Sequence, residues 1–431
     1  MKKIKKVFTL LCALMMILSL SACNSSTDKE ESDTTVVSDN SYSLVQNVYS
    51  WGAGYSKIIV PVNFKGDVDY LDAKDYTVSV TRYNTANEVL NSGERVVTAA
   101  YRSDEKGKSS EDGSYVTLDL ATTATISLGS PYYTDPNSFL SALKSWAKCD
   151  YVVTNAKTGD TWDEANTVYY PDEEKYLTST FEGEKTIPYA YYEAETEEKH
   201  PLVVWLHGAG SGGTDIGFVT GGMLVTNFVS DEVQEIFNGA DILLPQCETV
   251  WMDDGTGAYT SDGTSAYTSS VKALIDDYVA NHENIDTNRI YVGGCSNGGY
   301  LTVKLAIEYP DLFAACFPVC EAYESEWISD EEVAKIASVP TWFVHCSSDP
   351  VVDINTTAIA LYERMKEAGA ENLHFTVYES IVDPDYGNSY IGHFAWVYSL
   401  KNLCKTDYDG SPVTVDGQEV SLYEWLATCT K

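Results

Sequence analysis

Residues 289–299 read RIYVGGCSNGG and combine a short apolar strand, a glycine-rich turn and the beginning of a helix. The turn contains the pattern G-x-S-x-G, with Ser296 at its centre. A serine at such a corner needs small neighbours, because strand and helix approach each other closely there. The free N–H groups at the helix N-terminus favour the negative charge that forms when a serine attacks a carbonyl. The stretch therefore predicts that Ser296 is a catalytic nucleophile.

Both sides of this stretch alternate between short apolar strands and amphipathic helices. Strands are predicted over 187–192, 202–207, 241–245, 289–293, 314–320, 340–346 and 373–378. Helices are predicted over 265–282, 298–309, 330–338 and 354–368. Ser329 and Glu332 form a capping box before the third of these helices. This alternation is typical of βαβ units in a mainly parallel sheet, so we expect an α/β domain over 175–431.

The apolar strand that ends at residue 206 is followed by HGAG over 207–210. In acyl-transfer enzymes a strand end of this kind supplies a backbone N–H to the oxyanion, and the residue after the nucleophile supplies a second. We therefore expect an oxyanion hole made by the N–H groups of Asn297 and of Ala209 or a neighbouring glycine. His207 is expected to shape this loop and not to act as the base.

The base is expected late in the chain, if the order is serine, acid, histidine. Of the six histidines, His393 alone lies on a loop between the last predicted strand and a helix. A loop position lets an imidazole reach a serine, and imidazole in general suits taking and returning one proton near neutral pH. We therefore predict His393 as the base. His345 lies inside an apolar strand and is expected to be a core residue.

The acid is expected to follow the strand before that. Asp349 comes directly after the strand predicted over 340–346 and is the preferred candidate. Asp353 is the alternative, and Glu379 and Asp383 fit less well. The role of the acid is to hold one imidazole tautomer and to stabilise the imidazolium.

Four motifs in this half of the chain occur in an order and at separations that resemble the α/β-hydrolase superfamily. They are HGAG over 207–210, GCSNGG over 294–299, HCSSDPVVD over 345–353 and GHFAW over 392–396. The match is to secreted esterases of the polyhydroxybutyrate-depolymerase-like and feruloyl-esterase-like kinds. The resemblance implies Ser296 as nucleophile, His393 as base and Asp349 as acid. Cys295 is a departure, because it places a thiol beside the nucleophile at a position that varies in the family.

The region over 42–170 has a β pattern. Strands are predicted over 56–64, 76–83, 94–101 and 115–120, and the one helical stretch is 136–146. Strands at this spacing indicate a small β-sandwich. We find no His/Asp/Ser grouping in it, so a structural or binding module is expected. Its pattern and position resemble the Ig-like domain that precedes the catalytic domain in some bacterial esterases.

The N-terminus has the pattern of a secretory signal over 1–22, in which four lysines precede an apolar run over 7–20. Residues 20–23 read LSAC and resemble a bacterial lipobox, which predicts lipid on Cys23; the alternative is an ordinary cleaved signal with a chance cysteine. The polar stretch over 23–41 is predicted to be a flexible tether. The protein is therefore expected on the outer face of the bacterial cell membrane.

The charge of the chain excludes one class of partner. Its 431 residues hold 28 Lys and Arg against 64 Asp and Glu, a net charge of −36. Such a surface repels phosphate backbones, so nucleic-acid binding is not expected. The cysteines show no C-x-x-C zinc pattern, and neither a metal nor a cofactor is expected. Cys247, Cys295, Cys320 and Cys346 are expected near one edge of the sheet, as buried apolar residues or with a disulfide.

Three tryptophans follow predicted strand ends and are candidates for the substrate pocket. Trp251 and Trp396 could each form a pocket wall or pack in the core. The segment over 321–329 could form a small lid with Trp327 facing the site.

The predicted function is a serine carboxylester hydrolase that forms an acyl-enzyme on Ser296. Small esters and acetyl or feruloyl esters of plant polysaccharide are the expected substrates. The alternative is a serine peptidase of the prolyl-oligopeptidase-like branch, but a β region of roughly 120 residues is too small for its propeller. The third hypothesis is a surface-binding lipoprotein with an inactive hydrolase fold.

Overall fold

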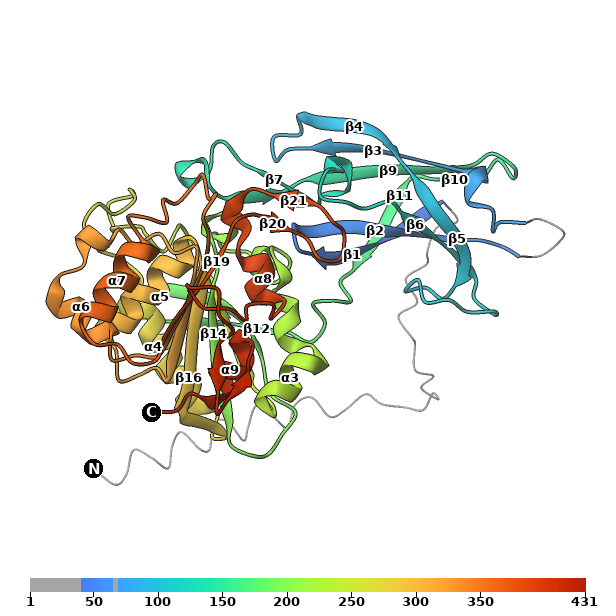
Figure 1. Cartoon of the computed structure of the whole chain (residues 1–431). Coiled ribbons are helices and arrows are strands. Elements are labelled where there is room, and N and C mark those ends of the chain that lie inside the picture. The colour runs from blue at the N-terminus through green and yellow to red at the C-terminus, as the bar shows by residue number, and fades with distance from the viewer. Residues whose placement is uncertain (1–39, 65–68) are drawn as a thin grey trace, which may run out of the picture. The chain divides into compact units, whose positions relative to one another are not determined.

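The computed structural model describes residues 40–64 and 69–431, and these fall in one compact unit (Figure 1). The predicted signal, the predicted lipidation site at Cys23 and most of the predicted tether lie outside the described residues. Within the described ranges, no helix has the length and apolar character that crossing a membrane requires. The chain forms a β domain followed by an α/β domain, which we call the front domain and the α/β domain.

The front domain is a sandwich of two sheets. One sheet has the strand order β11 (Glu164–Tyr169), β1 (Ser41–Tyr49), β2 (Gly52–Pro61), β6 (Tyr115–Leu120), β5 (Val97–Ser103). The other has the order β10 (Thr161–Trp162), β9 (Lys148–Asn155), β3 (Tyr76–Tyr83), β4 (Val89–Arg95). Alternate side chains of both sheets, such as Ile58, Val78 and Val153, are buried between them. This arrangement confirms the small β-sandwich that the sequence predicted.

Two predictions for this domain are wrong. The strand predicted over 94–101 is two strands in different sheets, because the side chain of Arg95 is buried and bonds to Tyr55 O while Val96 is exposed at the corner. The helix predicted over 136–146 is a short 3-10 turn, η3 (Phe139–Ser141), followed by strand β8 (Lys144–Trp146). Leu140 and Ser141 have positive φ values of 50° and 55°, which a right-handed helix does not allow. Strand β8 pairs instead with β7 (Tyr132–Thr134).

The α/β domain is built on an eight-stranded sheet. Its order is β12 (Leu177–Glu182), β13 (Thr186–Tyr192), β15 (Asp241–Pro245), β14 (His200–Leu206), β16 (Ile285–Cys295), β17 (Ala315–Val319), β18 (Thr341–Cys346), β19 (Leu373–Tyr378). The strands from β14 to β19 run parallel, and β12 and β13 are the antiparallel edge. Every strand and helix predicted here is present, with ends that agree within four residues.

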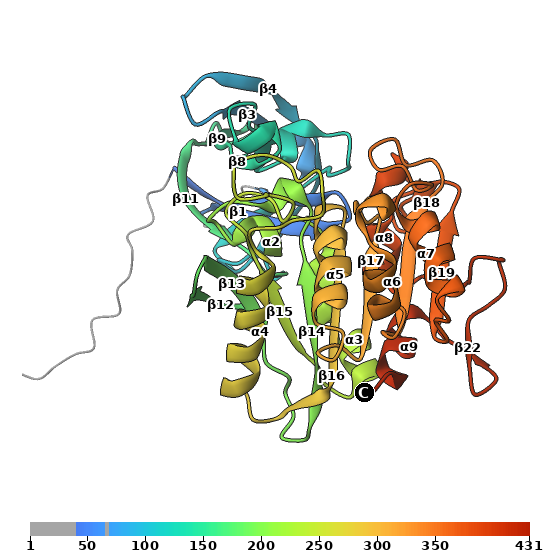
Figure 2. The same ribbon diagram turned by 90° about the vertical axis from the view of Figure 1, so that its left-hand side faces the viewer.

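Helices cover both faces of this sheet (Figure 2). One layer holds α4 (Thr268–Asn281), α5 (Asn297–Glu308), α6 (Asp330–Ile336) and α7 (Ala358–Glu367); the other holds α3 (Asp231–Phe237), α8 (Trp396–Leu400) and α9 (Leu422–Thr428). Side chains of β14 alternate between the layers: Leu202 and Val204 pack against the first, and Trp205 packs against the second. A sheet buried on both faces explains why its strands read as continuous apolar runs.

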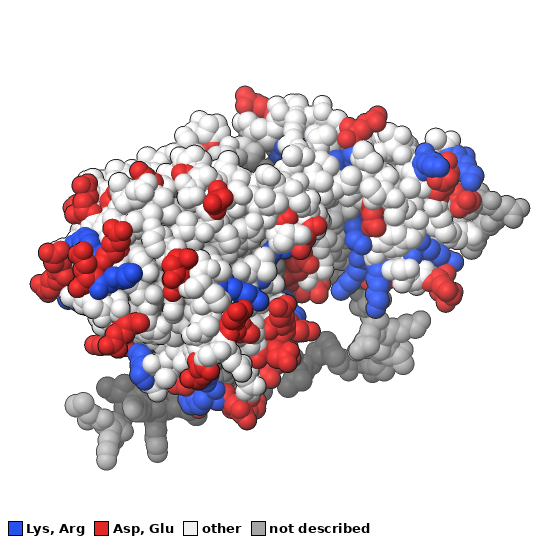
Figure 3. All heavy atoms as spheres, viewed as in Figure 1, with Lys and Arg blue, Asp and Glu red and all other residues white. Residues whose placement is uncertain are grey.

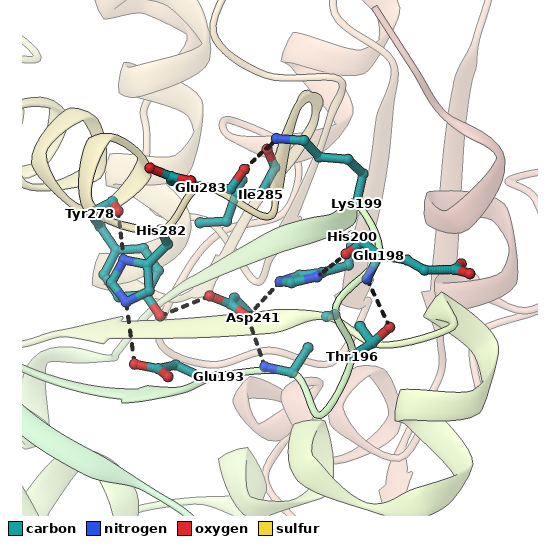
Figure 4. A network of polar contacts seen from close by, with 12 residues as sticks. Glu193, Thr196, Glu198, Lys199, His200, Asp241, Tyr278, His282, Glu283 and Ile285 are labelled. Carbon is teal, nitrogen blue, oxygen red and sulfur yellow. Dashed lines mark hydrogen bonds and ion pairs between the residues drawn. The ribbon is translucent and has the colours of Figure 1, made fainter.

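A polar network stabilises the edge of the sheet where the parallel strands begin (Figure 4). Asp241 is buried and accepts hydrogen bonds from His200 Nε2 at 2.8 Å, Tyr278 OH at 3.1 Å and Ala194 N at 2.8 Å. His200 is the first residue of β14 and is buried. The motif residues lie at the opposite, carboxyl ends of the strands, so this network holds the sheet and takes no part in the site.

Candidate active site

Ser296 occupies a strained corner between β16 and α5. Its backbone has φ 55° and ψ −116°, a conformation that costs energy and persists because the surroundings impose it. Its N–H donates to Val319 O at 2.9 Å. A Cβ on Gly294 would lie 2.6 Å from Gly298 O, and a Cβ on Gly298 would lie 2.0 Å from Leu206 O. This close backbone contact requires glycine at both positions. It is the contact that the G-x-S-x-G pattern predicts for a sharp turn between strand and helix.

The structure brings Ser296, His393 and Asp349 together from three separate segments. His393 lies in the turn η7 (Gly392–Phe394), and Asp349 follows the end of β18. His393 Nε2 is 2.9 Å from Ser296 Oγ, and His393 Nδ1 is 2.7 Å from Asp349 Oδ2. With Nδ1–H donating to the carboxylate, Nε2 is free to accept the proton of the serine hydroxyl.

Asp349 is held as a carboxylate although its side chain is fully buried. Burial raises the pKa of Asp349, but hydrogen bonds from His345 and His393 outweigh that effect and hold the pKa well below its usual range. Its second oxygen accepts the N–H groups of Val351 at 2.8 Å and Val352 at 3.1 Å. The carboxylate therefore stays charged and fixed in direction.

The other acid candidates have different partners. Asp353 is exposed and accepts from the N–H and side chain of Asn355. Asp383 accepts from Ser50 Oγ and from Tyr390 OH. Neither has a hydrogen bond to His393 in the described structure, so Asp349 is the one carboxylate placed on the imidazole.

His345 is a member of the site that the sequence did not identify. It lies in β18 with a fully buried side chain, and its Nε2 is 3.1 Å from Asp349 Oδ2, the oxygen that His393 also contacts. Burial lowers the pKa of His345, which favours a neutral ring that donates through Nε2. Its Nδ1 has no hydrogen-bond partner among the described residues. The spacing of four residues between His345 and Asp349 was the available signal, because a turn after a strand can return a side chain to that strand's end.

The residues predicted for the oxyanion hole lie at the first turns of two helices. Ala209 begins the 3-10 turn η4 (Ala209–Ser211), and Asn297 begins α5. Both line the same cavity as Ser296. N–H groups at these positions have no partner within their own helix and can bind an anion. The side chain of Asn297 is engaged elsewhere, since its Oδ1 accepts from Trp251 N.

His207 has the loop-shaping position expected for it. Its Nδ1 is 2.7 Å from Gly208 O, and its Nε2 accepts the N–H of Cys247 at 3.3 Å. Burial lowers the pKa of His207 to about 4, so the ring is neutral. It joins the loop of the oxyanion residues to the end of β15.

A cavity of about 540 Å³ opens at Ser296 and has walls from both domains. The α/β domain supplies the motif residues and Met252, Tyr259, Phe394 and Trp396. The front domain supplies the opposite wall: Ser50, Trp51, Tyr132 and Lys144. The front domain is thus part of the candidate site and does not only precede it.

The three tryptophan candidates lie in different environments. Trp396 lines the cavity, which is one of the two alternatives that the sequence left open. Trp251 does not: its ring is fully buried, packs against His207 and donates Nε1–H to His207 O at 3.0 Å. The prediction of Trp251 as a pocket wall is therefore wrong, and its alternative, core packing, is correct. Trp327 packs against Tyr323 and the core on the α4–α7 side, outside the cavity, so the segment over 321–329 does not place it over the site.

The front domain also contacts the segment that leads to His393. Strands β20 (Ile381–Val382) and β21 (Ser389–Tyr390) form a hairpin just before the histidine. Ser50 donates to Asp383 of this hairpin and lies 2.9 Å from Tyr390 OH. The ring of Trp51 meets Tyr386 edge-on at 5.0 Å. The front domain therefore braces the loop that carries the candidate base.

The cysteines near the site are free and buried. Cys247, Cys295, Cys320 and Cys346 form no disulfide, so the alternative of buried small residues describes them. Burial raises the pKa of Cys295 to about 12, which keeps the thiol beside Ser296 protonated. In the described ranges, no cluster of three His, Cys, Asp or Glu side chains is arranged to hold a metal ion.

Two family models match the chain, one for each domain. Residues 41–167 match an esterase Ig-like N-terminal domain, and residues 188–384 match the Phospholipase/Carboxylesterase model. Residues 188–384 are thus similar to carboxylesterases, and the domain in front is similar to an esterase Ig-like domain. Both the fold class and the resemblance stated from the sequence are confirmed, and the matches support a serine hydrolase.

Two individual proteins are similar to parts or most of this chain. The crystal structure of a thermostable esterase aligns with a TM-score of 0.70 at 24% identity, over 91% of this chain and 100% of that one; at this identity it shows the shared fold of both domains. Poly(3-hydroxyalkanoate) depolymerase C of Paucimonas lemoignei is 44% identical over 50 residues, which span 12% of this chain and 12% of that protein. The matched segment thus spans only a small part of that curated relative.

Proposed function

We propose that this protein is a serine carboxylester hydrolase that forms an acyl-enzyme on Ser296. The observation that carries the proposal is the continuous contact from Asp349 through His393 to Ser296, at the wall of a cavity of about 540 Å³. The carboxylesterase family match supports the same class of substrate.

The geometry supports a mechanism in two halves. Ser296 Oγ attacks the ester carbonyl while its proton passes to His393 Nε2, and the imidazolium is stabilised by Asp349. The oxyanion is bound by the N–H groups of Ala209 and Asn297. His393 then protonates the departing alcohol, which leaves the acyl group on Ser296. In the second half His393 takes a proton from water, the hydroxide attacks the acyl carbonyl, and Ser296 recovers its proton as the acid departs.

The proposed substrates are small esters and acetyl or feruloyl esters of plant polysaccharide. The aromatic side chains of Trp51, Tyr132 and Trp396 line the cavity, and flat rings of this kind suit the faces of sugars and of aromatic acyl groups. The proposed location is the outer face of the cell membrane, held by lipid on Cys23, since residues 20–23 read LSAC. Cys23→Ser should then release the protein from the membrane fraction; an unchanged distribution would refute the anchor.

Initial rates test the proposed activity. A soluble form that begins after Cys23 is assayed with p-nitrophenyl acetate, butyrate and octanoate, methyl ferulate and Ala-Pro-p-nitroanilide, beside Ser296→Ala. We expect ester turnover that the substitution abolishes and no cleavage of the anilide. Strong anilide cleavage would favour the peptidase alternative, and ester turnover that survives Ser296→Ala would remove Ser296 as the nucleophile. Absence of any turnover would favour the inactive binding protein.

A further inference from the structure

One cationic side chain, Lys144, lines the cavity. It lies in β8 of the front domain, in the segment that the sequence predicted to be helical. Its Cε lies 3.6 Å from the position that a Cβ on Gly210 would take, so the side chain packs over the loop of the oxyanion residues. Its Nζ lies 4.2 Å from the centre of the Tyr132 ring. An aromatic face stabilises an ammonium without neutralising it.

Lys144 has no acidic partner among the described residues, although the chain is strongly acidic. The chain holds 64 Asp and Glu against 28 Lys and Arg, and Figure 3 shows acidic side chains spread over the face that it draws. Several other lysines of the described structure pair with carboxylates, among them Lys57 with Asp119 and Lys148 with Asp150, and others do not. Lys144 differs from all of them because it lines the cavity. No described carboxylate lies within ion-pair distance of Lys144, and none of the described residues that line the cavity is Asp or Glu.

We propose that Lys144 binds a carboxylate carried by the ester substrate, so that the enzyme prefers esters with a negative charge a few atoms from the scissile carbonyl. This inference rests on the proposed function and specifies its substrate class. Lys144 packs over Gly210, the residue after Ala209, so a carboxylate bound there lies on the oxyanion side of the carbonyl. A half-ester of a dicarboxylic acid places the charge on the acyl side, and an acylated hydroxy acid or uronate places it on the alcohol side. The ammonium donates to either.

The charges around the cavity favour a local preference for anionic esters and not a long-range attraction of anions to the protein surface. An acidic surface repels an anionic substrate at long range, so a net preference for an anionic ester requires a local cation inside an otherwise uncharged cavity. A hydrogen bond to a charged group changes the free energy of a bound state enough for a preference of about tenfold to a hundredfold. The preference should weaken as salt is raised, because a half-exposed charge is screened.

A matched pair of substrates for each side tests the proposal. p-Nitrophenyl hemisuccinate and p-nitrophenyl butyrate differ in a carboxylate against a methyl group at the end of the acyl chain. 4-Acetoxybenzoate and 4-acetoxybenzamide differ in a carboxylate against an amide on the alcohol side. The readout is the ratio of kcat/KM within each pair, for the wild type, Lys144→Met, Lys144→Arg and Lys148→Met. Lys148→Met is the control for net charge, because Lys148 is on the same domain, outside the cavity and paired with Asp150.

We expect Lys144→Met to lower the charged-to-neutral ratio of one pair by about tenfold or more, while Lys144→Arg and Lys148→Met keep it. The pair that responds identifies the side of the ester that carries the charge. Ratios that are the same in wild type and Lys144→Met for both pairs would overturn the inference. That result is distinct from failure of the proposed function, in which butyrate turnover is absent or survives Ser296→Ala.

Discussion

The two walls of the cavity hold their side chains in different ways. On the wall from the α/β domain, each reactive group has a fixed partner: Ser296 meets His393, His393 meets Asp349, and Asp349 is held by four donors. On the wall from the front domain, Trp51 and Tyr132 present rings and Lys144 presents an unpaired ammonium. Fixed hydrogen bonds suit chemistry, which needs one geometry, whereas rings and a screened charge suit recognition, which must accept a substrate and release it.

The largest effect should come from the wall of the α/β domain. His393→Gln removes the proton acceptor from Ser296 and should lower kcat for p-nitrophenyl butyrate by about four to six orders of magnitude. His374→Gln is the matched control, because His374 pairs with Asp407 away from the cavity, and it should retain activity. A rate for His393→Gln within tenfold of wild type would mean that the polar chain does not perform the chemistry.

A smaller effect should come from the histidine behind the acid. His345→Leu leaves Asp349 with one donor fewer on Oδ2 and should lower kcat by about tenfold to a hundredfold. It should also move the acid limb of the pH–rate profile, because the charge that Asp349 presents to His393 changes. His345→Gln retains an N–H donor and should restore part of both. If His345→Leu and His345→Gln lose kcat equally and the acid limb of the pH–rate profile does not move, His345 is only a packing residue.

The front wall should affect the choice of substrate. Trp51→Ala removes a ring from the cavity and should lower kcat/KM for methyl ferulate relative to p-nitrophenyl acetate by about tenfold. An acetyl group is too small to need that wall. The measurement is the ratio of the two kcat/KM values. An unchanged ratio would contradict the claim that the front-domain wall contributes to the choice of substrate.

The smallest effect should be on the pH dependence of folding stability, through a buried carboxyl group of the α/β domain. Glu321 is fully buried, one of its oxygens accepts from Tyr323 N at 2.7 Å, and the other has no partner among the described residues. Burial raises the pKa of Glu321 to about 8. The folded state therefore holds a proton that the unfolded state loses near pH 4.5, so this stabilisation is complete below that pH and is lost as pH rises towards 8.

The melting temperature of the wild type should therefore fall more steeply between pH 5 and 8 than that of Glu321→Gln, which has no proton to lose. Thermal unfolding over this range measures both slopes. Glu326→Gln, at an exposed position of the same segment, should keep the wild-type slope. Parallel curves for wild type and Glu321→Gln would show that Glu321 is already charged in the fold.

The two walls also differ in how far the sequence predicts them. The strand, turn and helix around Ser296 leave a local pattern, because close backbone contacts with the turn and with the end of β14 require glycine at 294 and 298. His393 and Asp349 follow from chain order and from their places after predicted strands. The sequence therefore placed in one site all three residues that the structure joins by hydrogen bonds.

The front wall leaves no such pattern. Ser50 and Trp51 lie between β1 and β2, and Lys144 lies in a segment whose spacing predicts a helix. Their contacts with the α/β domain depend on how the two sheets of the front domain pack against loops of the α/β domain. The same reason explains Trp251: its position after a strand end left a pocket wall and core packing both open, and its ring packs in the core. Local patterns predict elements and motifs; long-range packing decides which other side chains reach them.

The central claim is that an ester acylates Ser296, and trapping that intermediate tests it most directly. The protein is mixed with p-nitrophenyl butyrate, quenched in acid within the first turnover, digested and analysed by tandem mass spectrometry. Cys295→Ala is run beside it, because the neighbouring thiol lies on the same peptide. We predict a butyryl group on Ser296 in both proteins, in step with a burst of p-nitrophenol, and neither signal in Ser296→Ala. A butyryl group on another residue, or a burst that persists in Ser296→Ala, would contradict the account.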